Sequence, residues 1–370
     1  MIATGSDALR TALASLLFLL AACGARTDTA ALCTSATTAD ERIIPLTFEA
    51  RRRELDLVIV LDGSSSMQGR LRALAANADA VARAAFAVAD DTDVYLYATT
   101  TGGASEPIAR YQTPAALAAA FAPLPALATS GGEGGFWMTY LGIRIVLGEM
   151  PEYCALGECP AGDRPMLVVL LADSPSDDGF DPDARFPGAG LEPTARMLAE
   201  RGARVVAVYA NGERVARDVL PLVEASRGFG LDDQPIAVEA GVDDLPARTI
   251  DVLHRAAREI RFDLDVAARP EGSEPGAVRG VRVLSAIPEP RDGLLDTHVL
   301  GVLPGAVITL ELNVDTSRLP AGRTTDVIVE FTEASGRVNH GQIVSPITVD
   351  ATIERCIPTR DAGDSTRPAG

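Results

Sequence analysis

A nearly unbroken apolar run from Leu55 to Val60 is followed at once by the loop Asp62-Gly63-Ser64-Ser65-Ser66. Such a run predicts a strand that is buried on both faces of a parallel sheet. Ligands of open α/β sheets bind just beyond the carboxyl ends of the strands. The carboxylate of Asp62 and the alternating hydroxyls of Ser64 and Ser66 therefore predict a hard, all-oxygen metal site, with Mg²⁺ or a related ion as the expected guest.

A second apolar strand, Met166 to Leu171, ends in the same way at Ala172-Asp173-Ser174-Pro175. Between the two strands lies a glycine-rich loop, Thr129 to Phe136, whose glycines would let the backbone pass close to a bound ion. For one metal site to form, each of these loops must reach the same point in space. This requirement makes Asp173, which again follows a buried strand, a candidate ligand.

The pattern Asp-x-Ser-x-Ser resembles the first loop of the metal-ion-dependent adhesion site of von Willebrand factor A domains. The stretch from about Glu54 to Ile260 is compatible with that resemblance. In the family, a later loop supplies an aspartate that holds the metal mostly through water, and Asp173 matches that position. Ser174 stands where the family usually has glycine.

Most von Willebrand A domains offer a threonine in the middle loop. Integrin β subunits instead offer a glutamate within a Glu-Gly-Gly-Phe string, which Glu133 to Phe136 repeat residue for residue. The resemblance thus implies Glu133 rather than Thr129, and a divalent cation (Mg²⁺, Ca²⁺ or Mn²⁺) held by Asp62, Ser64, Ser66, Glu133 and Asp173. Three formal negative charges bind such a cation more tightly but leave less Lewis acidity for an incoming group.

The first 22 residues read as a secretory signal peptide, because Arg10 precedes an apolar stretch, Thr11 to Ala22, that is too short to span a bilayer. The stretch ends at Leu20-Ala21-Ala22-Cys23, which resembles a bacterial lipobox. That resemblance implies cleavage before Cys23, acylation of its thiol and, with Gly24 next, sorting to the outer membrane. The alternative is an ordinary signal peptide with a fortuitous cysteine.

The other four cysteines agree with an oxidising compartment and allow three pairings. A local disulfide between Cys154 and Cys159 is expected because both lie in one short loop, and Cys33 would then pair with Cys356 across nearly the whole mature chain. The alternative is four free buried thiols. A zinc site is disfavoured because the three histidines are scattered singly, at His254, His298 and His340.

Strand-like and helix-like patterns alternate from Asp56 to Ile260, which predicts an α/β fold with a doubly wound, mostly parallel sheet covered on both faces. The expected strands lie near residues 55–61, 93–99, 166–172, 204–210 and 235–239. The expected helices lie near residues 69–89, 114–121, 137–149, 191–201, 215–226 and 243–260.

After Arg261 the pattern changes to short alternating apolar stretches, which predict an antiparallel β-sandwich. They include Val281–Leu284, Val307–Val314 and Asp326–Phe331. The segment Ile43 to Phe48 also reads as a strand. A bond between Cys33 and Cys356 would place that strand in the sandwich and make the α/β domain an insertion, similar to the arrangement in integrin β subunits. Tandem domains are the alternative.

The expected organisation is therefore a signal peptide at 1–22 and a lipidated N-terminal segment with a sandwich strand at 23–53. A von Willebrand A domain follows at 54–261, a β-sandwich at 262–356 and a disordered tail at 357–370. The loop after Asp173 carries four further aspartates, which we interpret as a solvated acidic rim rather than a second calcium site, since they lack the ligand register of an EF-hand. They are Asp177, Asp178, Asp181 and Asp183.

The chain has 51 acidic and 33 basic residues and a formal net charge of -18. This balance argues against nucleic acid and against an anionic membrane face as partners, so contact with the membrane is expected only through the lipid anchor.

The favoured function is a lipid-anchored, extracytoplasmic binding module, not an enzyme, in which a carboxylate of a partner protein completes the metal's coordination. A metal-dependent hydrolase is the alternative, with Asp177 as base, but no histidine lies near the three loops and no Gly-x-Ser-x-Gly elbow is present. A third hypothesis is a metal-free scaffold of the cell envelope. The retained Asp62, Ser64, Ser66 and Asp173 argue against it.

Overall fold

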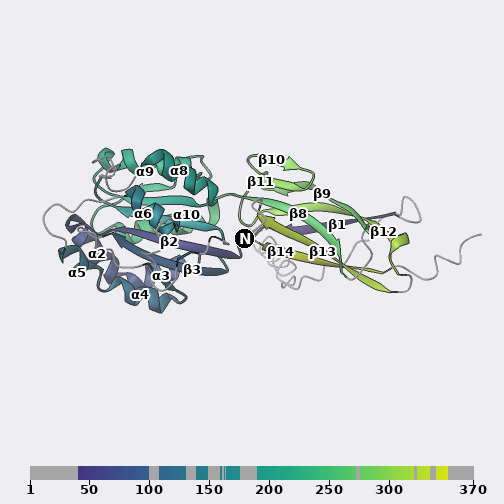
Figure 1. The fold of residues 1–370 in the computed structure, drawn as a ribbon, viewed down its shortest axis with the longest axis horizontal. Coiled ribbons are helices and arrows are strands. Elements are labelled where there is room, and N and C mark those ends of the chain that lie inside the picture. The colour runs from purple at the N-terminus through teal and green to yellow at the C-terminus, as the bar shows by residue number, and fades with distance from the viewer. Residues whose placement is uncertain are drawn as a thin grey trace, which may run out of the picture.

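The computed structural model describes residues 41–99, 108–130, 139–148, 159–160, 162, 164–175, 190–271, 276–320, 323–333 and 339–348. They form an elongated molecule in which an α/β domain and a β-rich domain lie end to end (Figure 1). The predicted fold class, a mostly parallel α/β sheet with a separate antiparallel β domain, is confirmed.

The α/β domain is built on a six-stranded sheet in the order β4-β3-β2-β5-β6-β7. All neighbours are parallel except the edge strand β4, which runs antiparallel to β3. Every residue of β5, and all but the first of β2, is buried, which explains the apolar runs in the sequence. The strands are β2 (Glu54–Asp62), β3 (Asp91–Thr99), β4 (Ala109–Tyr111), β5 (Met166–Ala172), β6 (Arg204–Tyr209) and β7 (Ala237–Glu239).

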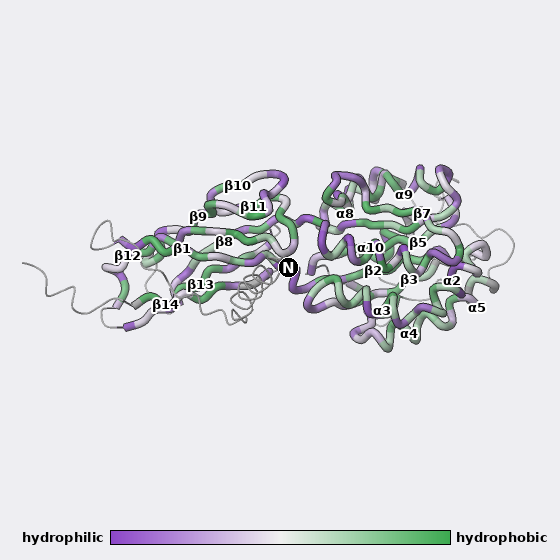
Figure 2. Tube along the Cα trace, turned by 180° about the vertical axis from the view of Figure 1, so that it is seen from behind, coloured by the Kyte–Doolittle hydropathy of each residue, from purple (hydrophilic) through white to green (hydrophobic). Residues whose placement is uncertain are grey.

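Helices cover both faces of this sheet, and each face has its own apolar cluster. One face packs against α2 (Gln68–Ala76), α3 (Ala78–Phe86), α4 (Pro114–Phe121), α5 (Leu124–Ser130) and α10 (Leu245–Glu259). The other packs against α6 (Thr139–Val146), α8 (Leu191–Glu200) and α9 (Glu213–Ala225). Figure 2 shows apolar central strands in the α/β domain, whereas the strands of the β-rich domain alternate between polar and apolar residues.

The single helix expected at 69–89 is wrong, because the chain forms two helices that separate at Asn77. The side-chain amide of Asn77 donates a hydrogen bond to the Ala73 carbonyl oxygen at 2.9 Å, and α2 ends there. The prediction also missed the short edge strand β4 and helix α5. Helix α5 extends to Ser130, so Thr129 lies in its last turn rather than in a loop.

The β-rich domain consists of two antiparallel sheets, β1-β12-β9 and β10-β11-β8-β13-β14, around one apolar core. The rings of Phe48 on β1 and Phe331 on β13 stack between the sheets, with centroids 3.6 Å apart. The strands are β1 (Glu41–Glu49), β8 (Phe262–Pro270), β9 (Val278–Ile287), β10 (Gly293–Leu295), β11 (His298–Val302), β12 (Val307–Asp315), β13 (Thr324–Glu333) and β14 (Asn339–Thr348).

Strand β1 belongs to this domain even though it precedes the α/β domain in the chain. It pairs with β12 along its whole length, from Glu41 opposite Asp315 to Glu49 opposite Val307. Its side chains alternate between exposed and buried from Ile43 onward. The α/β domain is therefore inserted between β1 and β8, and two chain segments cross the junction.

Several predictions concern residues outside the described ranges. These are the signal peptide, the lipidation site Cys23, the ligand Glu133, the acidic rim, the tail at 357–370, and Cys33, Cys154 and Cys356. Cys159 is in a disulfide, but the other four cysteines are not described, so the pairings remain predictions. Among the described residues, no helix combines the length and the apolar character needed to cross a membrane.

Candidate metal centre

The predicted strand ends lie side by side. Strands β2 and β5 are parallel neighbours, with Leu61 opposite Leu171. Asp62 is the last residue of β2 and Asp173 follows directly after β5, so both carboxylates emerge at the same edge of the sheet. This edge lies next to α2 and α5, at the end of the molecule far from the β-rich domain (Figure 1).

The carboxylate of Asp62 is fully buried and is held by backbone amides. The Ser64 amide donates to Oδ1 at 2.8 Å, and the Asp173 amide donates to Oδ2 at 3.4 Å. Burial nevertheless raises the pKa of Asp62 to about 6, and the nearby charge of Asp173 adds to the increase. The two backbone amides fix the position of the carboxylate but do not neutralise its charge. Such a carboxylate is suited to bind a cation.

The hydroxyl groups of the first loop point at the second carboxylate. The Ser66 hydroxyl donates to Asp173 Oδ1 at 2.7 Å, and the Ser64 and Ser66 hydroxyl oxygens are 2.9 Å apart. Ser66 is exposed, whereas Ser64 and Asp173 are buried, so the cluster opens to solvent on one side. Four of the five predicted ligands therefore converge: Asp62, Ser64, Ser66 and Asp173.

Sequence reasoning missed two residues at this site. Arg70 on α2 forms an ion pair with Asp173, with Nη1 and Oδ2 2.8 Å apart, and its own Nε is buried without a hydrogen-bond partner. Arg70 follows Ser66 by four residues, and this spacing on a continuous helical segment was a usable signal. Asn211, after β6, donates its amide to the Asp173 carbonyl oxygen. No pattern in the sequence pointed to it.

Ser174, which replaces the family's glycine, takes part in the same network. Its hydroxyl donates to Asp173 Oδ1 at 3.1 Å and lies 3.3 Å from the Ser66 hydroxyl. The replacement therefore adds an oxygen beside the carboxylate and leaves Asp173 in place.

Carboxylate and hydroxyl oxygens are the donor set that Mg²⁺, Ca²⁺ and Mn²⁺ take in proteins, so the four converging residues fit a divalent cation. The described residues contain no group of three or more histidines, cysteines, aspartates or glutamates that could hold a metal. Asp62 and Asp173 are two such residues, and Glu133, the predicted third, lies outside the described ranges.

No family model and no curated protein matches this sequence. Among solved structures, the chain is similar to a von Willebrand factor type A protein from Catenulispora acidiphila. The sequence identity is 13%, the match covers 85% of this chain and 71% of that chain, and the TM-score is 0.39.

Two further structures are similar at comparable levels. The SpaC pilus adhesin of Lactobacillus rhamnosus GG, in its open conformation, has 11% identity, 85% coverage of this chain, 47% of that chain and a TM-score of 0.36. The human COPII-coat protein Sec24c has 11% identity, 83% and 46% coverage and a TM-score of 0.42. This chain spans less than half of either protein. All three TM-scores are below 0.5, so the interpretation of the site rests on its own geometry.

Proposed function

We propose that this protein is an extracytoplasmic, lipid-anchored binding module that engages a protein partner through a divalent cation. Asp62, Ser64, Ser66 and Asp173 would hold the ion together with Glu133, and a carboxylate of the partner would complete its coordination. The observation that carries this proposal is the convergence of four of these side chains at the end of β2 and β5, with the exposed Ser66 on the open side.

The surroundings of the cluster favour binding over acid–base chemistry. The three histidines lie on α10, β11 and β14, and within the described part of the chain none is hydrogen-bonded to the cluster. The bound ion would supply a positive charge for a partner's carboxylate. Asp62, buried and held by two amides, would fix the position of that charge, and the hydroxyls of Ser64 and Ser66 would orient Asp173.

The first experiment measures Mn²⁺ and Mg²⁺ binding by isothermal titration calorimetry. Asp173→Asn preserves the shape of the side chain but removes the charge, and we expect at least an approximately hundredfold loss of affinity because the variant removes one of the negative charges that hold the ion. Asp251→Asn, at an exposed position on α10, is the matched control and should bind as wild type does. Equal binding by both variants and wild type would rule the site out.

The second experiment tests the partner and the anchor. Capture of an envelope protein by the wild-type chain should depend on Mn²⁺, stop with a chelator, fail with Asp173→Asn and survive Asp251→Asn. Acylation is tested separately, by incorporation of labelled palmitate into the wild type and into Cys23→Ser. Hydrolysis of a generic ester or phosphate substrate that a chelator abolishes would instead favour the metal-dependent hydrolase.

A further inference from the structure

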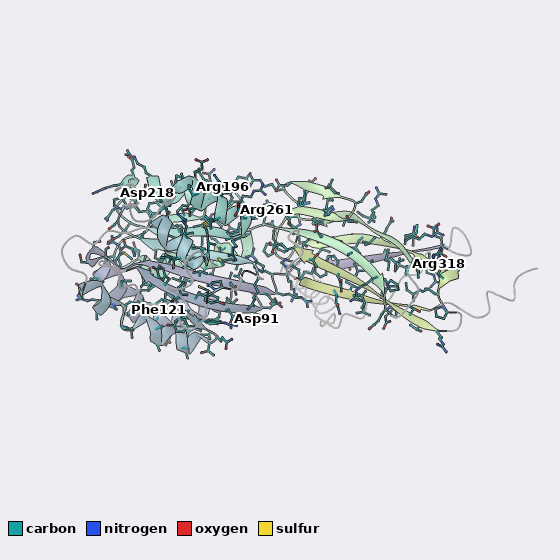
Figure 3. The ribbon with its side chains drawn as sticks, viewed as in Figure 1. Asp91, Phe121, Arg196, Asp218, Arg261 and Arg318 are labelled. Atoms are coloured by element: carbon teal, nitrogen blue, oxygen red, sulfur yellow. The ribbon has the colours of Figure 1, made fainter. Side chains whose placement is uncertain are left out.

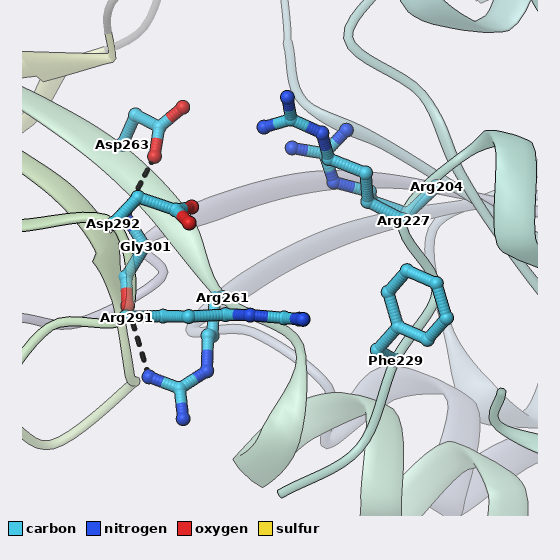
Figure 4. Close-up of a pocket in the computed structure, with 8 residues that line it drawn as sticks. All are labelled: Arg204, Arg227, Phe229, Arg261, Asp263, Arg291, Asp292 and Gly301. Carbon is cyan, nitrogen blue, oxygen red and sulfur yellow. Dashed lines mark hydrogen bonds between the residues drawn. The ribbon is translucent and has the colours of Figure 1, made fainter. Parts of the chain in front are cut away.

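A cleft of about 210 Å³ lies at the junction of the two domains (Figure 4). Its α/β wall carries Arg204, at the start of β6, and Arg227, which follows α9. Arg261, in the link between α10 and β8, and Arg291, after β9, contribute from the other side. Figure 3 shows Arg261 at this junction. The volume is several times the roughly 30 Å³ that one water molecule occupies, so a small ion fits with part of its hydration shell.

The arginines of this cleft are poorly neutralised. Arg204, Arg227 and Arg261 form no ion pair with any residue in the described ranges, and the Nε of Arg261 is buried without a hydrogen-bond partner. Figure 4 shows the guanidinium groups of Arg204 and Arg227 next to each other. Burial lowers the pKa of Arg204; the charges of Glu333 and Asp263 oppose this shift, and the charge of Arg227 adds to it. Both guanidinium groups are cationic, so they repel each other.

Specific contacts hold the arginines in this arrangement. Arg204 donates to the Ser226 carbonyl oxygen at 3.3 Å, and Arg261 donates to the Gly301 carbonyl oxygen at 3.1 Å. Arg291 pairs with Asp233 at 3.1 Å and lies over the ring of Phe229, 5.5 Å from its centroid. Each guanidinium keeps further N–H donors after these contacts, because the group has five.

Two aspartates also line the cleft, and the charge of Asp263 partly offsets that of Arg204. Asp263 accepts a hydrogen bond from the Gly301 amide at 2.7 Å, and neither Asp263 nor Asp292 forms an ion pair with a described residue. Figure 4 shows both carboxylates across the cleft from Arg204 and Arg227. Arg291 is paired with Asp233, so three arginines without an ion pair in the described ranges share the cleft with two aspartates, on a chain whose net charge is -18.

We propose that this cleft binds an oxyanion of the phosphate class, held between the guanidinium groups of Arg204 and Arg227 on one side and Arg261 on the other. Guanidinium groups bind phosphate and sulfate oxygens through paired N–H donors, and an anion here would relieve the repulsion between the two neighbouring arginines. Because the two sides belong to different domains, the bound anion would also fix the angle between them.

Calorimetric titration of the full chain with inorganic phosphate tests this proposal. Chelator is present throughout to exclude the metal centre, and the ionic strength is held constant with chloride. We expect saturable binding to wild type and an approximately tenfold loss of affinity in Arg227→Gln, since the variant loses one charge-assisted donor pair. Arg227 is exposed, so the change should spare the fold. Arg217→Gln, at an exposed position on α9 outside the cleft, is the matched control.

A second variant should change the phosphate affinity in the opposite direction. Asp292→Asn removes a negative charge that faces the anion and should strengthen phosphate binding by about threefold, an effect that general damage to the fold would not produce. Glycerol phosphate and sulfate, titrated in parallel, distinguish a phosphate ester from a free ion, and acetate should bind more weakly than either.

The proposal is overturned if wild type shows no saturable binding of phosphate, or if Arg227→Gln and Arg217→Gln bind it equally. It is also overturned if small-angle scattering shows that Arg227→Gln and Asp292→Asn open the molecule to the same extent while phosphate has no effect. That result would mean that the arginines and aspartates on the two sides of the cleft attract each other and bind no anion. None of these outcomes depends on divalent-cation binding.

Discussion

The two ends of the parallel sheet carry opposite charge. At the carboxyl ends of β2 and β5, two carboxylates are surrounded by hydroxyls, backbone amides and a single arginine. At the amino end of β6, four arginines share a cleft with two aspartates. Strand β6 connects the two, since it begins at Arg204 and ends two residues before Asn211, which is hydrogen-bonded at the acidic end.

The two ends differ in how their charges are compensated. At the acidic end Asp173 pairs with Arg70, whereas Asp62 accepts hydrogen bonds from backbone amides and from the Ser64 side chain, and its pKa is raised to about 6. At the basic end three arginines have no partner carboxylate in the described ranges. The contrast lies within one sheet, at places where its strands begin or end. We infer a cation site at one end and an anion site at the other.

The largest effect is expected from removing Arg70, which pairs with Asp173 at the acidic end. Arg70→Gln leaves Asp173 buried and unpaired, which should cost about 3–5 kcal/mol of unfolding free energy in the metal-free protein. The same change frees Asp173 Oδ2, so we expect an approximately tenfold gain in Mn²⁺ affinity. Saturating Mn²⁺ should then restore much of the lost stability.

Chemical denaturation and calorimetry measure both quantities. Arg72→Gln, an exposed position on the same helix, is the control for a lost arginine. Weaker Mn²⁺ binding by Arg70→Gln would mean that Arg70 supports the metal centre rather than competing with the ion.

Asp62 and His340 should change the stability of the fold in opposite directions as the pH changes. Burial raises the pKa of Asp62 from 3.8 to about 6, so the folded protein holds its proton more tightly than the unfolded chain does. Asp62 therefore destabilises the metal-free fold as pH rises from about 4 to 6. His340, buried at the domain junction against Phe262, behaves in the opposite way, because burial lowers its pKa from 6.5 to about 4. Its contribution to stability is lost as pH falls from 6.5 to 4.

Each shift corresponds to about 3 kcal/mol at about 1.4 kcal/mol per pKa unit, so the two effects largely cancel between pH 4 and 6.5. Asp62→Asn should make stability fall on acidification relative to wild type, and His340→Gln should make it rise. Denaturant unfolding of the three proteins at several pH values provides the measurement, with chelator present. If the unfolding free energy of all three proteins depended on pH in the same way, the pKa shifts of Asp62 and His340 would be contradicted.

The cluster around Asp62 and Asp173 could be predicted from the sequence, whereas the arginine cleft could not, and the difference has a physical reason. Asp62 and Asp173 each follow a strand that is buried on both faces, and that pattern is readable because apolar runs and the residues after them are local. The arginine cleft instead draws on β6, the turn after α9, the link before β8 and the segment after β9. Those segments are separated in the sequence, and no local pattern reveals that they meet.

The same reasoning explains the smaller errors. Helical periodicity continues across Asn77, so it predicted one helix, whereas a single side-chain hydrogen bond to Ala73 divides it in two. Arg70 was missed although its spacing from Ser66 was a usable signal, because that spacing does not identify its partner Asp173, which lies more than a hundred residues away in sequence. Edge strand β4 has only three residues, too few for a period of two to stand out.

The mildest test asks whether the hydroxyls of the first loop matter as much as its carboxylates. Ser66→Ala removes the 2.7 Å hydrogen bond to Asp173 Oδ1 and one candidate ligand oxygen, but leaves both charges in place. Because a hydrogen bond to a charged group is worth about 1.5–3 kcal/mol and Ser66 is exposed, we expect a loss near 1 kcal/mol, or about fivefold in Mn²⁺ affinity. Ser65→Ala alters the exposed neighbour, whose side chain has no hydrogen bond to the cluster, and should leave the affinity unchanged. Equal Mn²⁺ affinities in the two variants would mean that the Ser66 hydroxyl does not contribute to binding. The two ends of the sheet would then differ only in the charges of their side chains.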